Sequence, residues 1–144
     1  MPRFFHLLEA ERLLPEVEAL LREIIARRQE FESSEGELRV QLERVATAGG
    51  MIPPRERIAQ LRERRELAVR LLRGALEKLE ETGCLLKDAD MGLIDFPTLY
   101  RGRKVYLCWK LGETGIGFWH PVEDGFRGRR PLDGEFLANH CGDT

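Results

Sequence analysis

Apolar residues recur at three- and four-residue steps through the first half of the chain, and this spacing predicts two long helices. The first helical pattern extends from Leu7 to about Thr47, with glutamate and arginine between the apolar positions. Pro15 suits a first helical turn but not a helix interior, so the helix is expected either to begin near Leu14 or to carry a proline kink. Gly36 and the two serines before it favour a further kink or a short break.

The stretch TAGGMIPP, residues 47–54, separates this pattern from a second one, because its glycines end one helix and either proline can open the next. From Arg55 the apolar positions alternate in steps of three and four, which is typical of helices packed along a seam. Arg65 occupies one seam position, where it is expected to pair with a glutamate across an interface and to fix the register. Gly83 is placed to follow the last helical residue. Two such helices joined by a tight turn predict an antiparallel hairpin.

After Gly83 the pattern changes to that of short strands. The segments CLLKD, GLIDFPTLY, KVYLCWKL and IGFWH are separated by the glycine-containing turns YRGRK and GETG, and they predict an antiparallel β-meander of three or four strands. The fold class is therefore expected to be α+β, in a single domain of residues 1–132. The long antiparallel helical hairpin occupies residues 1–82, the meander and a loop occupy residues 83–132, and residues 133–144 are expected to be a flexible tail.

The register of the strands decides which side chains share a face of the sheet. A four-residue GETG loop pairs Leu107 with His120 and turns both side chains toward the core. A four-residue RGRK turn places Asp95 opposite Lys110 on the other face, whereas a bulge at Gly102 would shift that pairing by one residue.

The second face of the predicted sheet carries the candidate ligand-binding residues. They form either a shallow pocket or an ordinary cross-strand ion pair among half-buried neighbours, and we favour the ion pair, which contributes only ~0.2–1 kcal/mol. A nucleophilic pair of Cys108 and His120 is disfavoured because this register puts the two on opposite faces. The candidates are Asp95, Tyr106, Cys108, Lys110 and Trp119, with His120 beside them.

No spacing typical of a metal or nucleotide site is present. The chain lacks CxxC, HxxxH and HExxH, and the stretch from Asp88 to Asp95 lacks the alternating carboxylates of a calcium loop. GETGIG joins two strands and does not open a helix, so it offers no anion site. We therefore expect no bound metal and no cofactor.

Composition narrows the classes of function. The chain has 23 Lys and Arg against 25 Asp and Glu, a formal net charge of −2, whereas proteins that grip nucleic acid carry a basic excess. Nucleic-acid binding is thus not expected, although Arg101, Arg103, Lys104 and residues 127–130 could form a local patch. The absence of a long apolar run argues against a membrane span, and three cysteines without CxxC spacing indicate a reduced cytoplasmic protein.

The segments FHLLEAERLLPEVEALLREI, GCLLKDADMGLIDFP and VYLCWKLGETGIGFWHPVEDGFRGRRPL resemble a bacterial family catalogued as domain of unknown function 2203. The resemblance covers most of residues 3–132. It implies a helical hairpin with a small β part in a soluble bacterial protein, and it brings no assigned activity, cofactor or catalytic residue. Members of that family typically have a serine or threonine before the first helix, whereas His6 stands there in this chain and a hydroxyl cap is absent.

Two functions are consistent with these patterns. The apolar stripe is wider than one pair of helices can bury, which predicts a homodimer through the helices. The first hypothesis is accordingly a non-enzymatic interaction or scaffold module, with the meander as a recognition surface for an unidentified protein or small molecule. The alternative is a small-molecule or metal-binding protein, or an enzyme, that uses the polar face of the sheet.

Overall fold

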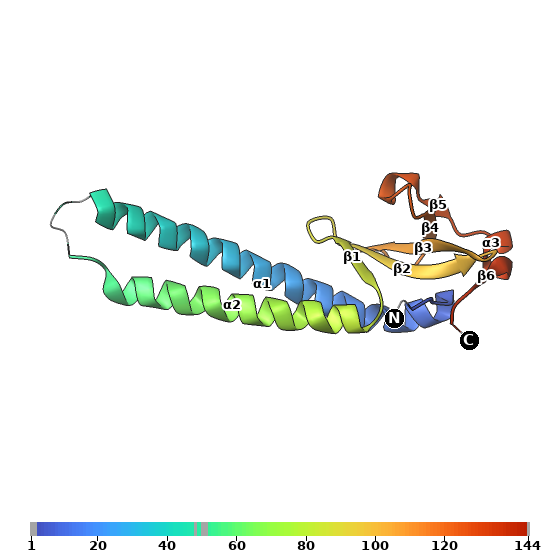
Figure 1. Cartoon of the computed structure of the whole chain (residues 1–144), viewed down its shortest axis with the longest axis horizontal. Coiled ribbons are helices and arrows are strands. Elements are labelled where there is room, and N and C mark those ends of the chain that lie inside the picture. Colours follow the sequence, from blue (N-terminus) through green and yellow to red (C-terminus); the bar gives the residue numbers. More distant parts are fainter. Residues whose placement is uncertain (1–2, 48, 50–51, 144) are drawn as a thin grey trace. The chain divides into compact units, whose positions relative to one another are not determined.

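The computed structural model of the chain describes residues 3–47, 49 and 52–143. Its fold is α+β, with two long helices that pack together and an antiparallel sheet, and this confirms the predicted fold class (Figure 1). The chain divides into two compact units, which are described separately. One is Arg22–Leu76, and the other joins Met1–Leu21 to Glu77–Thr144.

Helix α1 spans Leu7–Thr47 without interruption. Pro15 lies inside it, so the expected later start is wrong, because capping interactions described below hold the first turn in place. The break expected near Gly36 is also absent. The buried side chain of Ser34 donates its hydroxyl to the Glu30 carbonyl at 2.8 Å, which satisfies the hydroxyl without leaving the helical conformation.

The unit Arg22–Leu76 is the outer part of the helical hairpin. Helix α2 spans Arg55–Glu81 and begins directly after two prolines, as predicted, while residues 48, 50 and 51 of the turn lie outside the described residues. Arg65 Nη1 lies 3.2 Å from Glu35 Oε2, so this arginine pairs with a glutamate of the other helix in the same chain, and a pairing across an interface between chains stays a prediction. One buried cluster of this part is formed by Leu38, Ile58 and Leu61, with Val45 packed against it.

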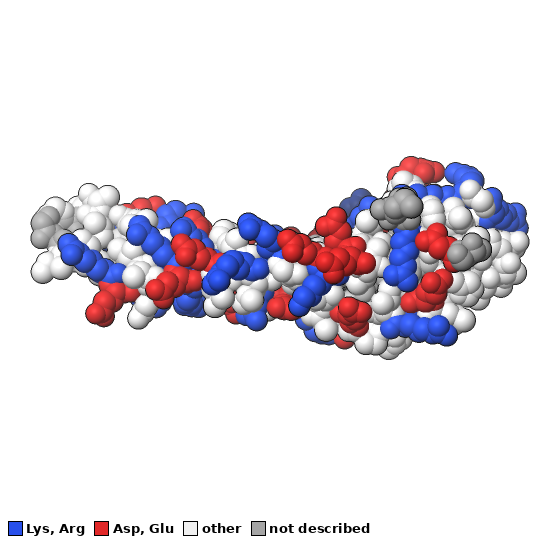
Figure 2. Space-filling model, turned by 60° about the horizontal axis from the view of Figure 1, so that its bottom comes forward, with Lys and Arg blue, Asp and Glu red and all other residues white. Residues whose placement is uncertain are grey.

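Charges of both signs are interspersed along the helices. Figure 2 shows blue and red side chains alternating over the hairpin on the face that it draws. Pairs such as Arg28 with Glu32, one turn apart and 3.2 Å apart, are exposed and contribute little to stability. Among the described residues, no helix combines the length and the apolar character that a membrane span requires.

The other unit contains an antiparallel sheet of six strands within the described residues, in the order β1-β2-β3-β4-β5 with β6 paired to β2. The predicted meander corresponds to β1 through β4, and two very short strands extend it. The strands are β1 (Leu85–Asp88), β2 (Leu93–Tyr100), β3 (Arg103–Lys110), β4 (Phe118–Pro121), β5 (Arg130–Pro131) and β6 (His140–Cys141), with a 3-10 helix η1 at Phe126–Gly128.

A two-residue turn joins β2 to β3, where the sequence predicts four residues. Arg101 and Gly102 both have positive φ, 53° and 79°, as a tight hairpin turn requires. Asp95 therefore pairs with Cys108 and not with Lys110. Because the register differs from the predicted one by two residues, Asp95 keeps its predicted face.

The register between β3 and β4 differs from the predicted one by a single residue. Tyr106 pairs with His120 and Leu107 pairs with Trp119, because the connecting loop spans residues 111–117 and not only GETG. A one-residue shift reverses the face of every side chain in the strand. The predicted core position of His120 is therefore wrong, and Trp119 takes its place on the face of Leu107.

The C-terminal residues 133–143 belong to the fold, unlike the flexible tail expected from the sequence. Helix α3 spans Gly134–Asn139 and carries Phe136, whose side chain is buried. Its ring stacks on Tyr100 and Trp119 at centroid distances of 4.7 and 4.8 Å. These aromatic contacts hold the segment against the sheet.

Two histidines cap the start of α1. His6 Nδ1 accepts the Leu8 amide at 3.1 Å, and the His6 amide donates to Glu9 Oε1 at 3.1 Å, which together reproduce a capping box. His140 Nε2 accepts the Leu7 amide at 3.1 Å. The imidazole of His6 thus caps this helix in place of a hydroxyl side chain.

Candidate metal centre on the sheet

Three side chains that can ligate a metal converge on one face of the sheet. Asp95, Cys108 and His120 come from β2, β3 and β4, where Asp95 pairs directly with Cys108 and His120 pairs with Tyr106, two residues away on the same face. One ligand atom from each lies within 4.8 Å of the other two. All three side chains are buried, at 1 to 3% exposed. In the described part of the chain, no other group of three histidine, cysteine or acidic residues is arranged this way.

The hydrogen bonds of His120 determine where its protons lie. Nδ1 is 2.8 Å from the Pro121 carbonyl oxygen, which can only accept, so we assign a hydrogen to Nδ1. Nε2 faces the carboxylate of Asp95 at 3.0 and 3.1 Å. The two groups must share one further proton, held either on the imidazole or on the carboxyl group, because a bare Nε2 and a carboxylate would repel each other.

Burial shifts the pKa values of the other two groups. It raises the pKa of Asp95, while the positive charges of His120 and Lys87 act in the opposite direction. Burial, and then the negative charge of Asp95, raise the pKa of Cys108 to about 11, although the Arg129 guanidinium opposes the shift. The Cys108 thiol is therefore protonated at neutral pH.

This arrangement does not form a nucleophilic pair, although Cys108 and His120 share a face of the sheet. Both ring nitrogens of His120 are already occupied, one by the Pro121 carbonyl and one by Asp95. No nitrogen remains to take the proton of Cys108, and the high pKa of the thiol disfavours a thiolate nucleophile. The group instead resembles a ligand set whose protons a metal would displace.

A cavity of about 130 Å³ opens beside the three side chains. It has room for about four water molecules. The segment after β4, helix η1 and strand β1 all contribute to the lining. Apart from the three potential ligands, the lining consists of Lys87, Leu93, Tyr106, Val122, Gly125 and Phe126.

Arg129 supports the centre from the side of Cys108. Its guanidinium lies between two aromatic rings, 3.9 Å from the Phe118 centroid and 4.4 Å from the Phe126 centroid. It also forms an ion pair with Glu113 at 2.8 Å. These contacts fix a positive charge near the sulfur, which favours the thiolate form that a metal needs.

The structure brings together four of the six candidate residues, because Asp95, Tyr106, Cys108 and His120 line one cavity. The side chain of Lys110 is outside the lining, and its Nζ lies 5.6 Å from the Phe126 ring centroid. Trp119 lies on the opposite face, as its pairing with Leu107 requires. Sequence reasoning missed the contributions of the segment after β4, which shows no periodicity: Val122, Gly125, Phe126 and Arg129.

Comparison with known proteins places the chain in a family. A search of curated proteins and a search of solved structures each found no match. The model of the family described as "Uncharacterized conserved protein (DUF2203)" matches residues 3–132, a range that includes all three potential metal ligands. The chain therefore belongs to this family, which is the one that its sequence resembles.

Proposed function

We propose that this protein binds one divalent transition-metal ion, with Zn²⁺ as the best match, through Asp95, Cys108 and His120. The observation that carries the proposal is the buried convergence of a carboxylate, a thiol and an imidazole from three adjacent strands. Zinc accepts all three donor types, whereas calcium and magnesium take only oxygen ligands. Three protein ligands beside a cavity correspond to a zinc site with one open position.

The hydrogen bond of the other ring nitrogen of His120 supports the same proposal. A histidine that ligates a metal through Nε2 usually donates its Nδ1 hydrogen to a carboxylate or a backbone carbonyl, which fixes the ring orientation. The Pro121 carbonyl accepts that bond here, at 2.8 Å. Nε2 is thereby directed toward Asp95 and Cys108.

The distances and charges are compatible with a metal. Ligand atoms about 2.0–2.3 Å from a tetrahedral zinc ion lie about 3.3–3.8 Å from one another. The three side chains, whose ligand atoms lie within 4.8 Å, need to close by roughly 1 Å. Zn²⁺ would replace the proton shared by Asp95 and His120 and the thiol proton of Cys108. The net charge of the buried centre would stay the same, so no uncompensated charge would be created.

Metal binding with an open position corresponds to the second of the two functions expected from the sequence. The cavity beside the ligands favours an exchangeable fourth ligand over a closed structural site. The homodimer through the helices stays a prediction, and the metal proposal does not depend on it.

The test is a titration of the metal-free full chain with Co²⁺, which reports thiolate ligation through a sulfur-to-cobalt charge-transfer band. The wild-type protein should bind one Co²⁺ per chain and show the band. Cys108→Ser should lose the band and bind at least about tenfold more weakly, since even the loss of a residue that only orients a ligand costs about 10–100-fold in metal affinity. Cys141→Ser is the matched control, because Cys141 is exposed and outside the centre. Absence of the band in the wild-type protein, or its persistence in Cys108→Ser, would contradict the proposal.

A further inference from the structure

Of the four lysines in the chain, one lines the cavity that contains the candidate metal centre, and two others lie near aromatic rings that line it. Lys87 lines the cavity, and its Nζ lies 4.8 Å from the ring centroid of Tyr106, which lines it too. Lys104 Nζ lies 5.5 Å from the same ring, and Lys110 Nζ lies 5.6 Å from the ring of Phe126. Three ammonium groups thus lie within cation–π distance of two aromatic rings that line one cavity.

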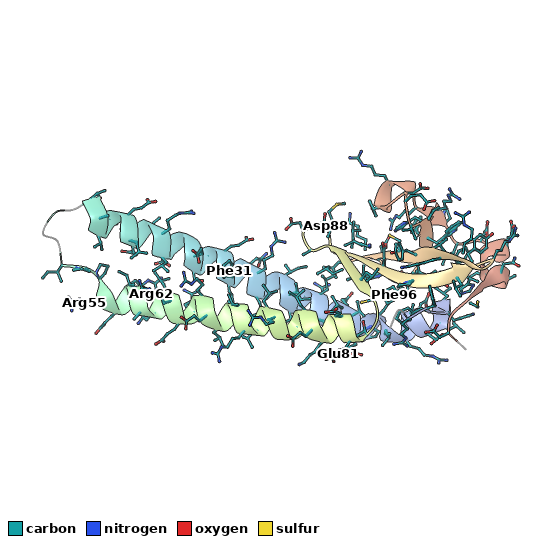
Figure 3. All side chains as sticks on the ribbon, in the orientation of Figure 1. Phe31, Arg55, Arg62, Glu81, Asp88 and Phe96 are labelled. Atoms are coloured by element: carbon teal, nitrogen blue, oxygen red, sulfur yellow. The ribbon has the colours of Figure 1, made fainter. Side chains whose placement is uncertain are left out.

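The three lysines form no salt bridge within the described part of the chain, although the charge of Lys87 also acts on Asp95. Four carboxylates of the surrounding loops have other partners. Asp88, at the end of β1 (Figure 3), accepts the Met91 amide at 3.0 Å. The other loop carboxylates pair with arginines: Glu113 with Arg129, Glu123 with Arg103, and Asp124 with Arg130.

We propose that the open position of the metal takes a small organic phosphate, whose phosphate group contacts Lys87 and is attracted by Lys104 and Lys110. The inference rests on the proposed metal binding and names the class of ligand for that site. A metal held by one carboxylate, one thiolate and a neutral imidazole has no net charge. The excess positive charge around the cavity therefore comes from the three lysines and calls for an anion that carries more than one charge.

The type of cation distinguishes a phosphate from a carboxylate. Ammonium groups act as point charges that suit phosphate, whereas planar bidentate recognition of carboxylate depends on a free guanidinium fork. The nearby fork, that of Arg129, is occupied by the two oxygens of Glu113 at 3.2 and 2.8 Å. A phosphate group carries about −1.5 to −2 at neutral pH, which matches several lysines better than one carboxylate does.

The size and walls of the cavity limit the organic part. A volume of about 130 Å³ holds a fragment of only a few heavy atoms beside the metal. Leu93, Val122 and Phe126 contribute apolar side chains to the lining of the cavity. A phosphate attached to a two- or three-carbon chain that ends in a metal-binding oxygen satisfies these conditions.

The test uses Co²⁺-loaded full-length protein and three probes: 2-phosphoglycolate, succinate and glycolate. Binding is followed by the change in the cobalt absorption spectrum. Phosphoglycolate should bind at least about tenfold more tightly than either carboxylate, as expected for charge-assisted bonds from the lysines. Its affinity should also fall as salt is raised. Equal or tighter binding of succinate would overturn the proposal in favour of a dicarboxylate ligand.

Lysine variants separate the contribution of the lysines to ligand affinity from that of the metal. Lys87→Met should weaken phosphoglycolate about tenfold, as for loss of a bond to a charged group. Lys104→Met and Lys110→Met should each weaken it about two- to fivefold, as for loss of an exposed charge. Lys78→Met is the matched control, because this fourth lysine is exposed on α2.

The two proposals fail in different ways. If the wild-type protein gives no cobalt band, the metal site itself is refuted and the ligand inference falls with it. If the band forms in the wild-type protein and in Lys87→Met, but Lys87→Met binds phosphoglycolate as tightly as Lys78→Met does, only the ligand inference is overturned.

Discussion

Cys108 should make the metal-free protein unusually sensitive to alkali. Its side chain is 1% exposed, and burial together with the charge of Asp95 raises its pKa from 9.0 to about 11. Between these two values the folded chain retains a proton that the unfolded chain loses, so the free energy of unfolding falls as the pH rises through this window. Two pKa units correspond to about 3 kcal/mol. The loss begins near pH 9 and is complete above about pH 11.

The assay is urea unfolding of the wild-type protein and Cys108→Ala at several pH values from about 8 to 11. The variant loses stability because of the cavity it creates, but that loss does not depend on pH. The free energy of unfolding of the wild-type protein should therefore fall by about 3 kcal/mol relative to that of the variant across this pH window. Saturating Zn²⁺ should abolish the difference in slope, because the metal-bound sulfur is already deprotonated. Parallel curves in the absence of metal would refute the reasoning about the buried thiol.

Three further predictions concern the rest of the fold. Stability should fall as the pH drops through about 6.5, because burial and then the charge of His6 lower the pKa of His140, so the folded chain resists a proton that the unfolded chain accepts. In urea unfolding, the free energy of unfolding of His140→Gln should fall less steeply below about pH 6.5 than that of the wild-type protein. An equally steep fall in both would contradict the capping role. Phe136→Ala should cost about 3–5 kcal/mol in the same assay, because the ring is 1% exposed; a loss below about 1 kcal/mol would show that α3 is not anchored as described. Light scattering should give twice the 16.6 kDa chain mass at micromolar concentration, and Leu42→Glu, at an exposed apolar position of α1, should shift it toward the monomer. A monomeric wild-type protein would refute the homodimer.

The helices could be predicted from the sequence because their signal is repeated many times. Apolar steps over about forty residues outweigh single contrary residues, so α1 runs through both Pro15 and Gly36. Near Gly36 a local hydrogen bond of the buried Ser34 hydroxyl keeps the helical conformation. Such compensations depend on the folded environment and leave no pattern in the sequence.

The prediction of the candidate site depended more strongly on small errors in the strand register. The error of two residues between β2 and β3 left Asp95 and Cys108 on one face, so their proximity could be predicted. The error of one residue between β3 and β4 exchanged His120 with Trp119. Its cause is the loop 111–117, where Glu113 accepts the Lys110 amide at 2.7 Å and ends the strand pairing. No turn signature in the sequence indicates this side-chain bond.

The ligand set of bound zinc tests the central claim most directly. Purified full-length protein would be loaded with one equivalent of Zn²⁺ and examined by X-ray absorption at the zinc edge. We expect one sulfur at about 2.3 Å and nitrogen or oxygen neighbours at about 2.0–2.2 Å from the zinc. Cys108→Ser should lose the sulfur contribution, and Cys141→Ser should keep it. A zinc environment without sulfur in the wild-type protein, or a chain that retains no zinc, would contradict the assignment of Asp95, Cys108 and His120 as a metal centre.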